Sequence, residues 1–549
     1  MKNWLILLLA LLALLVTGCQ SDSESSTETT HSSKALPYIL SAHYFSDAWP
    51  KTFWQAFETG KVADELAQIK QDGFNTVVLA VPWRGFETGF QNQRTSSRQV
   101  MYERLDFLLN AITEQDLLYV LRLGFPHDYS ADTGTTSLAL CEGLFTQQQT
   151  RDQWLDYLHK INQVTSKYSP ANAGTLVSWE DFWCPHFVFP QLDAEQRLSL
   201  SQQMGYGQWL QQRNPNINRV LLGIDDLRYD QIPVPQPGEL SYVLYLEFID
   251  EALNQHILAP AKSVFNNTAM EIRVDKLPIN NGQSTVWVSH DLHLDEPHHR
   301  GTYWAPFWGA DNRGELLAAD KALQVFEYFL KQITQDGQAT NHVIEQFNFY
   351  DNTPYFPNNA NIDPDQTADF LLGAVPLLKK YSAGVGVWAY RDYDDNGLYN
   401  ASFEIGLAGW QATGEVKVID TGDDHQLAMS TGAQISQSFI GPERFMLVGQ
   451  YPHLEFCLQS QESGTLQLLM NQQPVKTWEI ETGRNCTQVP AEPFQQNTAA
   501  EFSLQAQSTI TIDELKLYGF TQKLGLYQSN GQPGRHLEAY REFNRQLAK

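Results

Sequence analysis

Residues 62–81, VADELAQIKQDGFNTVVLAV, decide the fold. Residues 62–71 place apolar side chains at helical spacing, and residues 76–81 form the continuous apolar run of a buried strand. From about residue 36 to residue 390 the chain repeats this alternation of amphipathic segments and short apolar runs, the pattern of successive βα units. The pattern therefore predicts an α/β fold.

Counting these units predicts a (β/α)8 TIM barrel over residues 36–397. Eight strands are expected, at residues 38–42, 76–81, 118–123, 175–178, 220–224, 270–274, 342–347 and 385–389. Seven helices are expected after the first seven strands, at residues 62–71, 102–114, 151–164, 196–212, 240–264, 314–335 and 367–380. The eighth strand has no helix directly after it, so the last barrel helix must come from another part of the chain.

The sequence changes character after residue 397. Residues 398–520 contain short alternating runs with turn residues between them and no convincing helix, which predicts an all-β sandwich. In the return segment 521–549, residues 534–549 have apolar side chains at helical spacing. We expect this helix to complete the barrel, with the sandwich inserted before it. The alternative is a tail helix packed on the sandwich.

The charge of the chain excludes one class of partner. There are 63 Asp plus Glu against 37 Lys plus Arg, a formal net charge of -26. Nucleic acid binding depends on Lys and Arg that displace counterions from phosphates, so nucleic acid is not expected as a partner. The 14 Trp, 23 Tyr and 29 Phe residues supply ample material for a large core.

The first residues predict the compartment. A basic start precedes an apolar run at residues 5–16, and Val16-Thr17-Gly18-Cys19 follows. This resembles a bacterial lipoprotein signal, which implies removal of residues 1–18 and acylation of Cys19. A transmembrane anchor is the alternative, but this run spans only about 18 Å of a hydrocarbon core of roughly 30 Å.

Residues 19–35 are polar and rich in Ser and Thr, which predicts a flexible tether after the acylated cysteine. The resemblance also implies a location. Gln20 stands where such proteins carry an aspartate when they are retained at the inner membrane, so the outer membrane is expected, on its periplasmic face or at the surface.

Four further cysteines remain in the chain. In an oxidising compartment an even number predicts disulfides, with three pairings open. Proximity in sequence favours Cys141 with Cys184 and Cys457 with Cys486. A metal site of four thiolates is the alternative, but the chain has no CxxC spacing.

Two carboxylates stand at expected strand ends, where the reacting groups of a TIM barrel lie. Residues 178–181 are SWED and residues 343–348 are VIEQFN, so Glu180 and Glu345 each lie among apolar or aromatic residues. Such surroundings raise a carboxyl pKa, as a general acid requires near neutral pH. The alternative is a salt bridge inside the barrel, to Arg122 or Arg273.

These residues resemble the clan A retaining glycoside hydrolases. Glu180 matches the acid/base glutamate after strand four, Glu345 the nucleophile of strand seven, and Trp388 the tryptophan that ends strand eight beneath the sugar. Two positions depart from the family: Trp179 replaces the usual asparagine, and strand two lacks the usual arginine, for which Arg84 just beyond that strand and Arg122 of strand three are the candidates. The resemblance implies cleavage of β-glycosidic bonds by double displacement, without a cofactor for catalysis.

Aromatic and polar residues at the other strand ends predict a sugar site. The expected substrate contacts are Trp83, Arg122, Trp179, Trp183, Asp225, His290, Trp304, Asn348, Tyr350 and Trp388. Core packing is the alternative for each aromatic residue. The segment 285–312 is too long for an ordinary βα loop and is rich in His, Trp and Asp, and its histidines leave a zinc site open.

The β-domain resembles the jelly-roll carbohydrate-binding modules. Residues 399–410 (YNASFEIGLAGW) look like their first strand and residues 510–517 (ITIDELKL) like their last. The resemblance implies a structural calcium near these strands, with Glu404 and Asp513 as its ligands. The alternatives to a hydrolase are a glycan-binding lipoprotein on an inactive barrel and a surface protein of an exopolysaccharide system.

Overall fold

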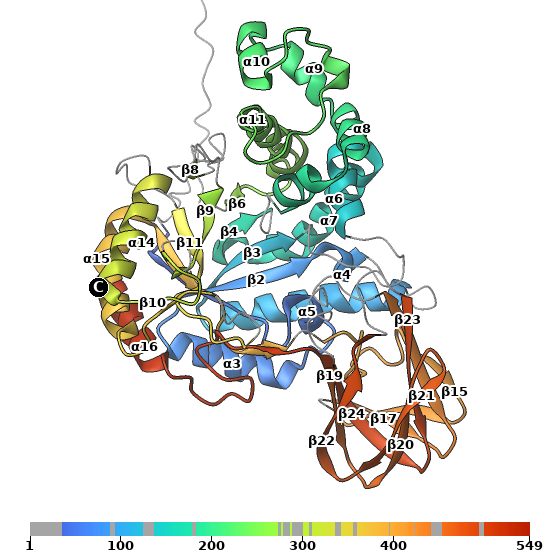
Figure 1. Ribbon diagram of the computed structural model, residues 1–549. Coiled ribbons are helices and arrows are strands. Elements are labelled where there is room, and N and C mark those ends of the chain that lie inside the picture. Colours follow the sequence, from blue (N-terminus) through green and yellow to red (C-terminus); the bar gives the residue numbers. More distant parts are fainter. Residues whose placement is uncertain are drawn as a thin grey trace, which may run out of the picture. The chain divides into compact units, whose positions relative to one another are not determined.

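Eight parallel strands form a nearly closed barrel in the computed structural model (Figure 1). In barrel order they are β1 (Ile39–His43), β2 (Thr76–Pro82), β3 (Leu118–Gly124), β4 (Asn172–Leu176), β5 (Thr268–Ala269) continued by β6 (Glu271–Ile272), β9 (Arg300–Trp304), β11 (His342–Phe347) and β13 (Gly384–Val387). Because β5 pairs with β4 while β6 pairs with β9, the short fifth strand joins both ends of the sheet.

The structure describes residues 36–87, 94–124, 137–177, 183–272, 276–277, 286–287, 300–306, 310–334, 342–354, 359–394, 396–422, 424–440, 453–492 and 499–549. Residues 38–549 form one unit, separate from the residues before them. The predicted signal, Cys19 and the tether lie outside the described residues. No helix among the described residues has the length and hydropathy that a membrane span needs.

Helices pack around the barrel. Those that cover it are α3 (Thr59–Gln71), α5 (Arg94–Glu114), α7 (Gln148–Thr165), α14 (Ala319–Ile333), α15 (Thr367–Tyr381) and α16 (Leu537–Leu547). Three shorter helices follow strands β1 to β3: α2 (Pro50–Phe53), α4 (Trp83–Glu87) and α6 (Ser137–Thr146). A helical excursion between β4 and β5 contains α8 (Ala194–Met204), α9 (Tyr206–Gln211), α10 (Pro215–Leu222), α11 (Tyr242–Leu253) and α12 (Ala259–Lys262).

One of the expected strands is wrong, and one strand of the barrel was not expected. Residues 220–224 were expected as strand five but belong to helix α10 and the turn after it. Asn214 caps this helix, Pro215 occupies its first turn, and Gly223 ends it in the left-handed conformation, so local capping outweighs the apolar run. The true fifth strand is β5 with β6, near the residues expected as strand six. The sixth is β9, inside the segment expected as a long loop.

Helix α16 packs beside the strands and helices that begin and end the barrel. Tyr540 stacks on Phe74 before β2, and Phe543 stacks on Phe347 of β11. Asp72, at the end of α3, accepts hydrogen bonds from Arg541 Nε at 2.8 Å and from the hydroxyl of Tyr527 at 2.9 Å. The return segment therefore supplies a helix that contacts both the first and the seventh units of the barrel.

The β-domain consists of two five-stranded antiparallel sheets around a shared core. One sheet has the order β15 (Gln411–Thr413), β18 (Gln434–Ile440), β23 (Ala499–Ala506), β20 (Gly464–Met470), β21 (Gln473–Ile480). The other has the order β16 (Val416–Asp420), β17 (His425–Met429), β24 (Ile510–Tyr518), β19 (His453–Ser460), β22 (Gly483–Pro490).

The expected first strand of the β-domain, residues 399–410, is a series of turns instead. Asn400 has a positive φ of 46°, and its side-chain amide donates to the carbonyls of Gly406 at 2.9 Å and Ala408 at 3.0 Å. The indole of Trp410 donates back to the carbonyl of Asn400 at 2.9 Å. Asparagine and glycine turn chemistry therefore outweighs the apolar alternation of this segment. The expected last strand is present as β24.

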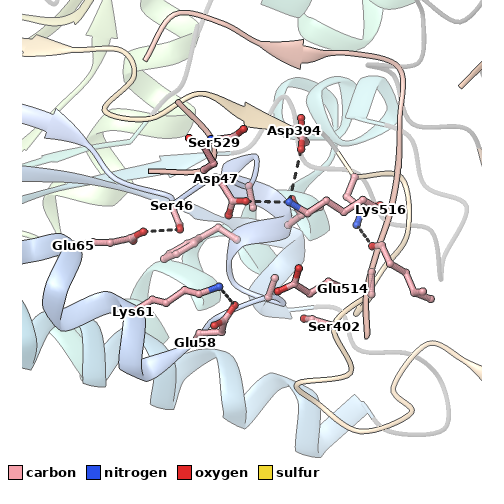
Figure 2. A pocket seen from close by; sticks show the side chains of 18 of the residues that line it. Ser46, Asp47, Glu58, Lys61, Glu65, Asp394, Ser402, Glu514, Lys516 and Ser529 are labelled. Atoms are coloured by element: carbon pink, nitrogen blue, oxygen red, sulfur yellow. Dashed lines mark hydrogen bonds and ion pairs between the residues drawn. The ribbon is translucent and has the colours of Figure 1, made fainter. Parts of the chain in front are cut away.

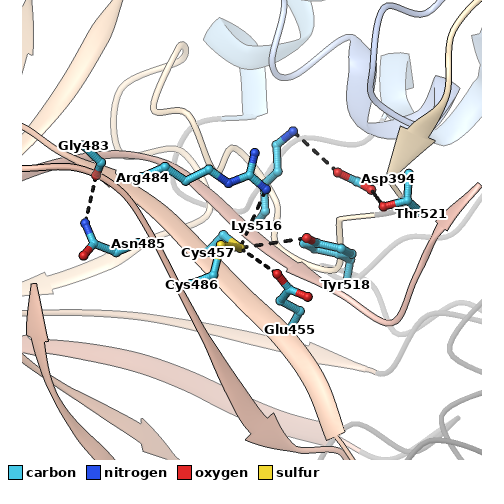
Figure 3. The surroundings of a disulfide bond; sticks show 10 residues. All are labelled: Asp394, Glu455, Cys457, Gly483, Arg484, Asn485, Cys486, Lys516, Tyr518 and Thr521. Carbon is cyan, nitrogen blue, oxygen red and sulfur yellow. Dashed lines mark hydrogen bonds and ion pairs between the residues drawn. A yellow bond between two sulfur atoms is a disulfide. The ribbon is translucent and has the colours of Figure 1, made fainter. Parts of the chain in front are cut away.

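Both expected disulfides are present, which confirms the pairing by proximity. Cys141 of α6 bonds to Cys184, four residues after Glu180 in the chain. Cys457 and Cys486 face one another across β19 and β22, with a Cα–Cα distance of 4.1 Å. Tyr518 and Arg484 lie beside the Cys457 sulfur (Figure 3). The Tyr518 hydroxyl is 3.9 Å and Arg484 Nη2 is 3.8 Å from that sulfur.

Candidate functional site

Glu345 lies inside the barrel because strand alternation places it there. Along β1 the interior positions are Ile39, Ser41 and His43, and Ile39 and Val343 share a small apolar cluster inside the barrel. Two residues beyond Val343, the Glu345 carboxyl meets the Ser41 hydroxyl, which donates to Oε1 at 3.2 Å. A polar layer therefore lies above an apolar layer, toward the C-terminal ends of the strands where barrel enzymes react.

A β-bulge in β11 brings a second polar side chain inward. Between Ile344 and Phe347, β11 has one more residue than β13, and it has the same excess over β9. The extra residue interrupts alternation, so Glu345 and Gln346 both point into the barrel. The Gln346 amide donates to Glu271 of β6. Bulges that redirect side chains are frequent next to active sites.

Arg122 of β3 and Glu271 form an ion pair at the centre of the barrel. Arg122 Nη2 lies 2.5 Å from Glu271 Oε2, and both side chains are 0% exposed. The guanidinium also lies over the ring of Trp388, with Cζ 5.7 Å from the ring centroid, a cation–π geometry. Arg122 is thus held by a carboxylate and by an aromatic face.

His43 connects Trp388 to the backbone of Glu345. Its Nε2–H donates to the Glu345 carbonyl at 2.7 Å, since a carbonyl oxygen only accepts. Its ring packs edge-on against Trp388 with centroids 4.8 Å apart. Burial, and next the charge of Arg122, hold the pKa of His43 well below its usual range, so this imidazole is neutral.

Glycine permits the close approach of the two carboxyl-bearing strands. A Cβ on Gly301 of β9 would lie 3.3 Å from Glu345 Cβ and 2.9 Å from Leu176 Cδ1. A Cβ on Gly386 of β13 would lie 2.2 Å from the Ser41 hydroxyl and 2.8 Å from the Glu345 carbonyl. Neither position has room for a side chain, and this leaves the interior space to the polar groups.

The Glu345 carboxyl is only 2% exposed, and burial raises its pKa to about 7. Arg122 opposes this shift, Glu271 adds to it by charge repulsion, and the Ser41 hydrogen bond opposes it. A carboxyl that titrates near neutral pH inside a barrel is a candidate for proton transfer or nucleophilic chemistry.

Three of the residues predicted to stack on sugar are buried and pack against other parts of the protein, as the core-packing alternative describes. Trp83 packs on Trp154 of α7 with ring centroids 5.4 Å apart. Gly301 faces the interior, so alternation turns Trp304 outward, where it stacks on Phe370 of α15. Tyr350 is buried against the return segment, and its hydroxyl donates to the carbonyl of Gly525.

Asp225 was expected at the end of a strand. Those residues belong to helix α10 instead, and the Asp225 side chain is exposed just after that helix. Asn348 follows β11, as expected, and its amide donates to the hydroxyl of Tyr303 at 3.4 Å. Trp179, Glu180 and His290 lie outside the described residues, as does the side chain of Trp183.

Sequence reasoning missed Ser41, His43, Glu271 and Gln346. Ser41 and His43 stand at alternate positions of a strand that was correctly expected, so strand parity was an available signal. Glu271 also lay inside an expected strand, but that strand was numbered sixth instead of fifth, so its expected neighbours were wrong. Gln346 had no signal, because alternation points it outward and only the bulge reverses it.

A cavity of about 220 Å³ lies where the β1–α3 segment meets residues 394–402 and 514–516 (Figure 2). Lys516 pairs there with Asp47 at 3.0 Å and with Asp394 at 3.7 Å, and Lys61 pairs with Glu58 at 2.6 Å. The two Lys516 pairs join three segments of the chain, whereas Lys61 and Glu58 lie within one turn of each other.

The two predicted calcium ligands have different surroundings: Glu404 is hydrogen-bonded to His425, and Asp513 lies near other carboxylates. Glu404 accepts hydrogen bonds from His425 N at 3.1 Å and from its ring Nδ1 at 3.2 Å. Burial, with Asp424, Glu514 and Glu404 nearby, raises the pKa of Asp513 to about 9. Among the described residues, the one group of three converging His, Cys, Asp or Glu ligand atoms is Glu455, Cys457 and Cys486, which contains the disulfide. Calcium at Glu404 and Asp513 stays a prediction.

No protein-family model matches the chain, and no curated protein matches it. Among solved structures, it is similar to an exo-β-1,4-mannosidase from Opitutaceae bacterium strain TAV5 (13% identity, 65% of this chain, 53% of that chain, TM-score 0.37). It is also similar to a GH5_18 protein from Streptomyces cattleya in complex with GlcNAc (15% identity, 66% of this chain, 72% of that chain, TM-score 0.37). A third similar structure is the catalytic domain of a β-amylase from Paenibacillus polymyxa (10% identity, 65% of this chain, 93% of that chain, TM-score 0.42). The chain spans about half the length of the mannosidase, and the fold assignment rests on strand pairing.

Proposed function

We propose that the chain is a retaining glycoside hydrolase that cleaves β-glycosidic bonds of a polysaccharide or oligosaccharide. The observation that carries the proposal is the Glu345 carboxyl, buried in the barrel interior and titrating near neutral pH. Arg122 and the Ser41 hydroxyl lie beside it and polarise it. Trp388, whose ring borders the same interior, is the aromatic residue proposed to lie beneath the pyranose.

In the proposed mechanism Glu345 attacks the anomeric carbon while Glu180 protonates the leaving oxygen. The bond from that carbon to the leaving oxygen breaks, and an ester to Glu345 forms. Glu180 then removes a proton from water, which displaces Glu345 with net retention. Such a pair requires carboxyl groups about 5 to 5.5 Å apart. The nucleophile must be ionised, so kcat/KM should fall as pH falls below about 7, where Glu345 takes up a proton.

The test is turnover by purified protein lacking residues 1–19. Release of reducing ends from a polysaccharide panel, and of phenolate from aryl β-glycosides, should occur with the wild type and fall by at least about 10³-fold in Glu345→Gln. Glu87→Gln is the matched control, because Glu87 pairs with Lys160 outside the barrel interior. Equal rates in wild type and Glu345→Gln would refute the assignment, and glycan binding without turnover would favour a non-catalytic barrel.

The β-domain is proposed to be a jelly-roll carbohydrate-binding module that holds a structural calcium. Its two antiparallel sheets and the acidic surroundings of Asp513 support this. Cys19 is proposed to carry the lipid that anchors the chain to the outer membrane. Incorporation of labelled palmitate in wild type and its loss in Cys19→Ser is the expected result, and equal labelling would refute the anchor.

A further inference from the structure

Two carboxyl groups share one guanidinium inside the barrel. The charged side chains and the histidine described there are Glu345 from β11, Glu271 from β6, Arg122 from β3 and His43 from β1. His43 is neutral, because burial and Arg122 hold its pKa well below its usual range. With both carboxyl groups ionised, one negative charge among these groups has no matching positive charge, and burial makes such a charge costly.

The geometry decides which carboxyl group carries the unmatched charge. Glu271 receives Arg122 Nη2 at 2.5 Å, and the Gln346 amide donates to its other oxygen. Glu345 receives a neutral hydroxyl, that of Ser41, at 3.2 Å. A charge-assisted contact is about twice as strong as a neutral one, so Glu271 is the better stabilised carboxylate. Gly301 between the two carboxyl groups keeps them close enough for repulsion.

From this arrangement we propose that Glu271 is a positioning residue: it engages Arg122 directly and thereby leaves Glu345 as the less compensated and more reactive of these two carboxylates. The reactivity of Glu345 rests on the proposed function, whereas the pairing of Arg122 with Glu271 does not depend on it. Trp388 restricts Arg122 from the other side, with Cζ 5.7 Å from the ring centroid, and so helps to keep the guanidinium on Glu271.

The chemical consequence concerns the covalent intermediate. When a Glu345 oxygen bonds to the anomeric carbon, the leaving oxygen departs with the proton of Glu180, and the Glu345 carboxylate becomes a neutral ester. The negative charge thereby passes from Glu345 to Glu180, and the net charge does not change. Ester formation therefore relieves the repulsion between Glu345 and Glu271, while the ion pair of Arg122 and Glu271 stays in place.

The test measures the titration of Glu345 without any substrate. Its pKa is raised, so the folded state binds a proton that the unfolded state releases, and stability falls as pH rises from about 4.5 toward 7. Relative to Glu345→Gln, the unfolding constant of the wild type should rise about 30-fold between pH 5.5 and 8. Hydrogen exchange of the peptide that contains β11 reports the opening of the barrel itself.

Two variants should move this titration in opposite directions. In Glu271→Gln the repulsion disappears and Arg122 is available to Glu345, so the pKa of Glu345 falls and the rise shrinks to less than about fivefold. In the double variant Arg122→Gln/Glu271→Gln the compensating cation is absent as well, so the pKa increases and the change continues above pH 8. Glu87→Gln, the matched control, should keep the wild-type profile.

A Glu271→Gln profile that matches the wild type would overturn the inference, and so would a downward shift in the double variant. If Glu271→Gln does not fold, the double variant, which removes both charges of the pair, still decides the matter by its direction of shift. A second readout concerns the proposed function. The 2-deoxy-2-fluoro-β-glucosyl and β-mannosyl fluorides should label Glu345 in the wild type and about tenfold more slowly in Glu271→Gln. If the label is found on another residue while the pKa of Glu345 still falls in Glu271→Gln and rises in the double variant, the proposed nucleophile is refuted and the charge arrangement stands.

Discussion

Asp72 should fasten the last helix to the barrel, and Asp72→Asn tests this. The carboxyl group is 1% exposed and accepts from four side chains on three segments. Tyr390 donates at 2.6 Å from the end of the eighth strand, and Tyr527 at 2.9 Å from the return segment. Arg541 of α16 donates through Nε at 2.8 Å. Asparagine keeps the shape but presents an amide NH2 group to these donors.

The size of the effect follows from the exposure of the partners. Removing one member of a buried ion pair costs about 3–5 kcal/mol, because the partner charge is left without compensation. Arg541 is 34% exposed and regains water, so the lower end of that range, about 3 kcal/mol, applies. The two tyrosine hydroxyls are buried and contribute the larger part. If the loss is confined to the docking of α16, its amides should exchange about 100-fold faster.

Hydrogen exchange of residues 537–547 measures the docking directly. Glu538→Gln is the control, since Glu538 also pairs with Arg541 but is 81% exposed, and such pairs contribute about 0.2–1 kcal/mol. Exchange in Asp72→Asn within threefold of the wild type would mean that apolar contacts alone hold α16, and the role assigned to Asp72 would be wrong.

Three further outcomes follow from the described contacts. Gly301→Ala should lower stability by about 1–3 kcal/mol in urea unfolding, because the new methyl group meets Leu176 at 2.9 Å, and an unchanged midpoint would contradict the packing. Replacing Cys141 and Cys184 by serine should cost about 2–4 kcal/mol in the same assay, since the bond closes a segment with a sequence separation of 43; a loss below 0.5 kcal/mol would count against it. Without divalent cations the wild type should lose thermal stability relative to Asp513→Asn as pH rises from 5 to 9, because the folded pKa of Asp513 is about 9. Calcium should reverse this loss in the wild type only, and parallel curves would contradict the raised pKa.

The barrel could be predicted because its strands and helices keep regular periods. Residues 76–81 and 118–123 are continuous apolar runs between amphipathic helices, and both are strands in the structure. The prediction of the fifth and sixth strands was wrong for a physical reason. The fifth is split around Met270 into two pieces of two residues each, too short to give a periodic signal, while residues 220–224 carry a convincing apolar run inside a capped helix.

Counting strands correctly is what decides which side chains meet. With residues 270–274 counted as strand six, Glu271 is expected next to strand seven, and the expected fifth strand separates it from strand four. The structure places it on the fifth strand, and β9 stands between it and β11. Gly301 of β9 has no side chain to fill that position, so Glu271 and Glu345 approach each other across the intervening strand.

The candidate site could be predicted where side chains alternate regularly between the two faces of a strand, and not where a β-bulge interrupts that alternation. Glu345 needed only the knowledge that interior residues alternate, and the same rule finds Ser41 and His43 on β1. Gln346 required the extra residue in β11, which no local pattern announces. The bulge turns Gln346 inward, and its amide, together with Arg122, stabilises Glu271 as a carboxylate. A backbone irregularity beyond the reach of sequence periodicity therefore helps to set the charge on the residue that the sequence did identify.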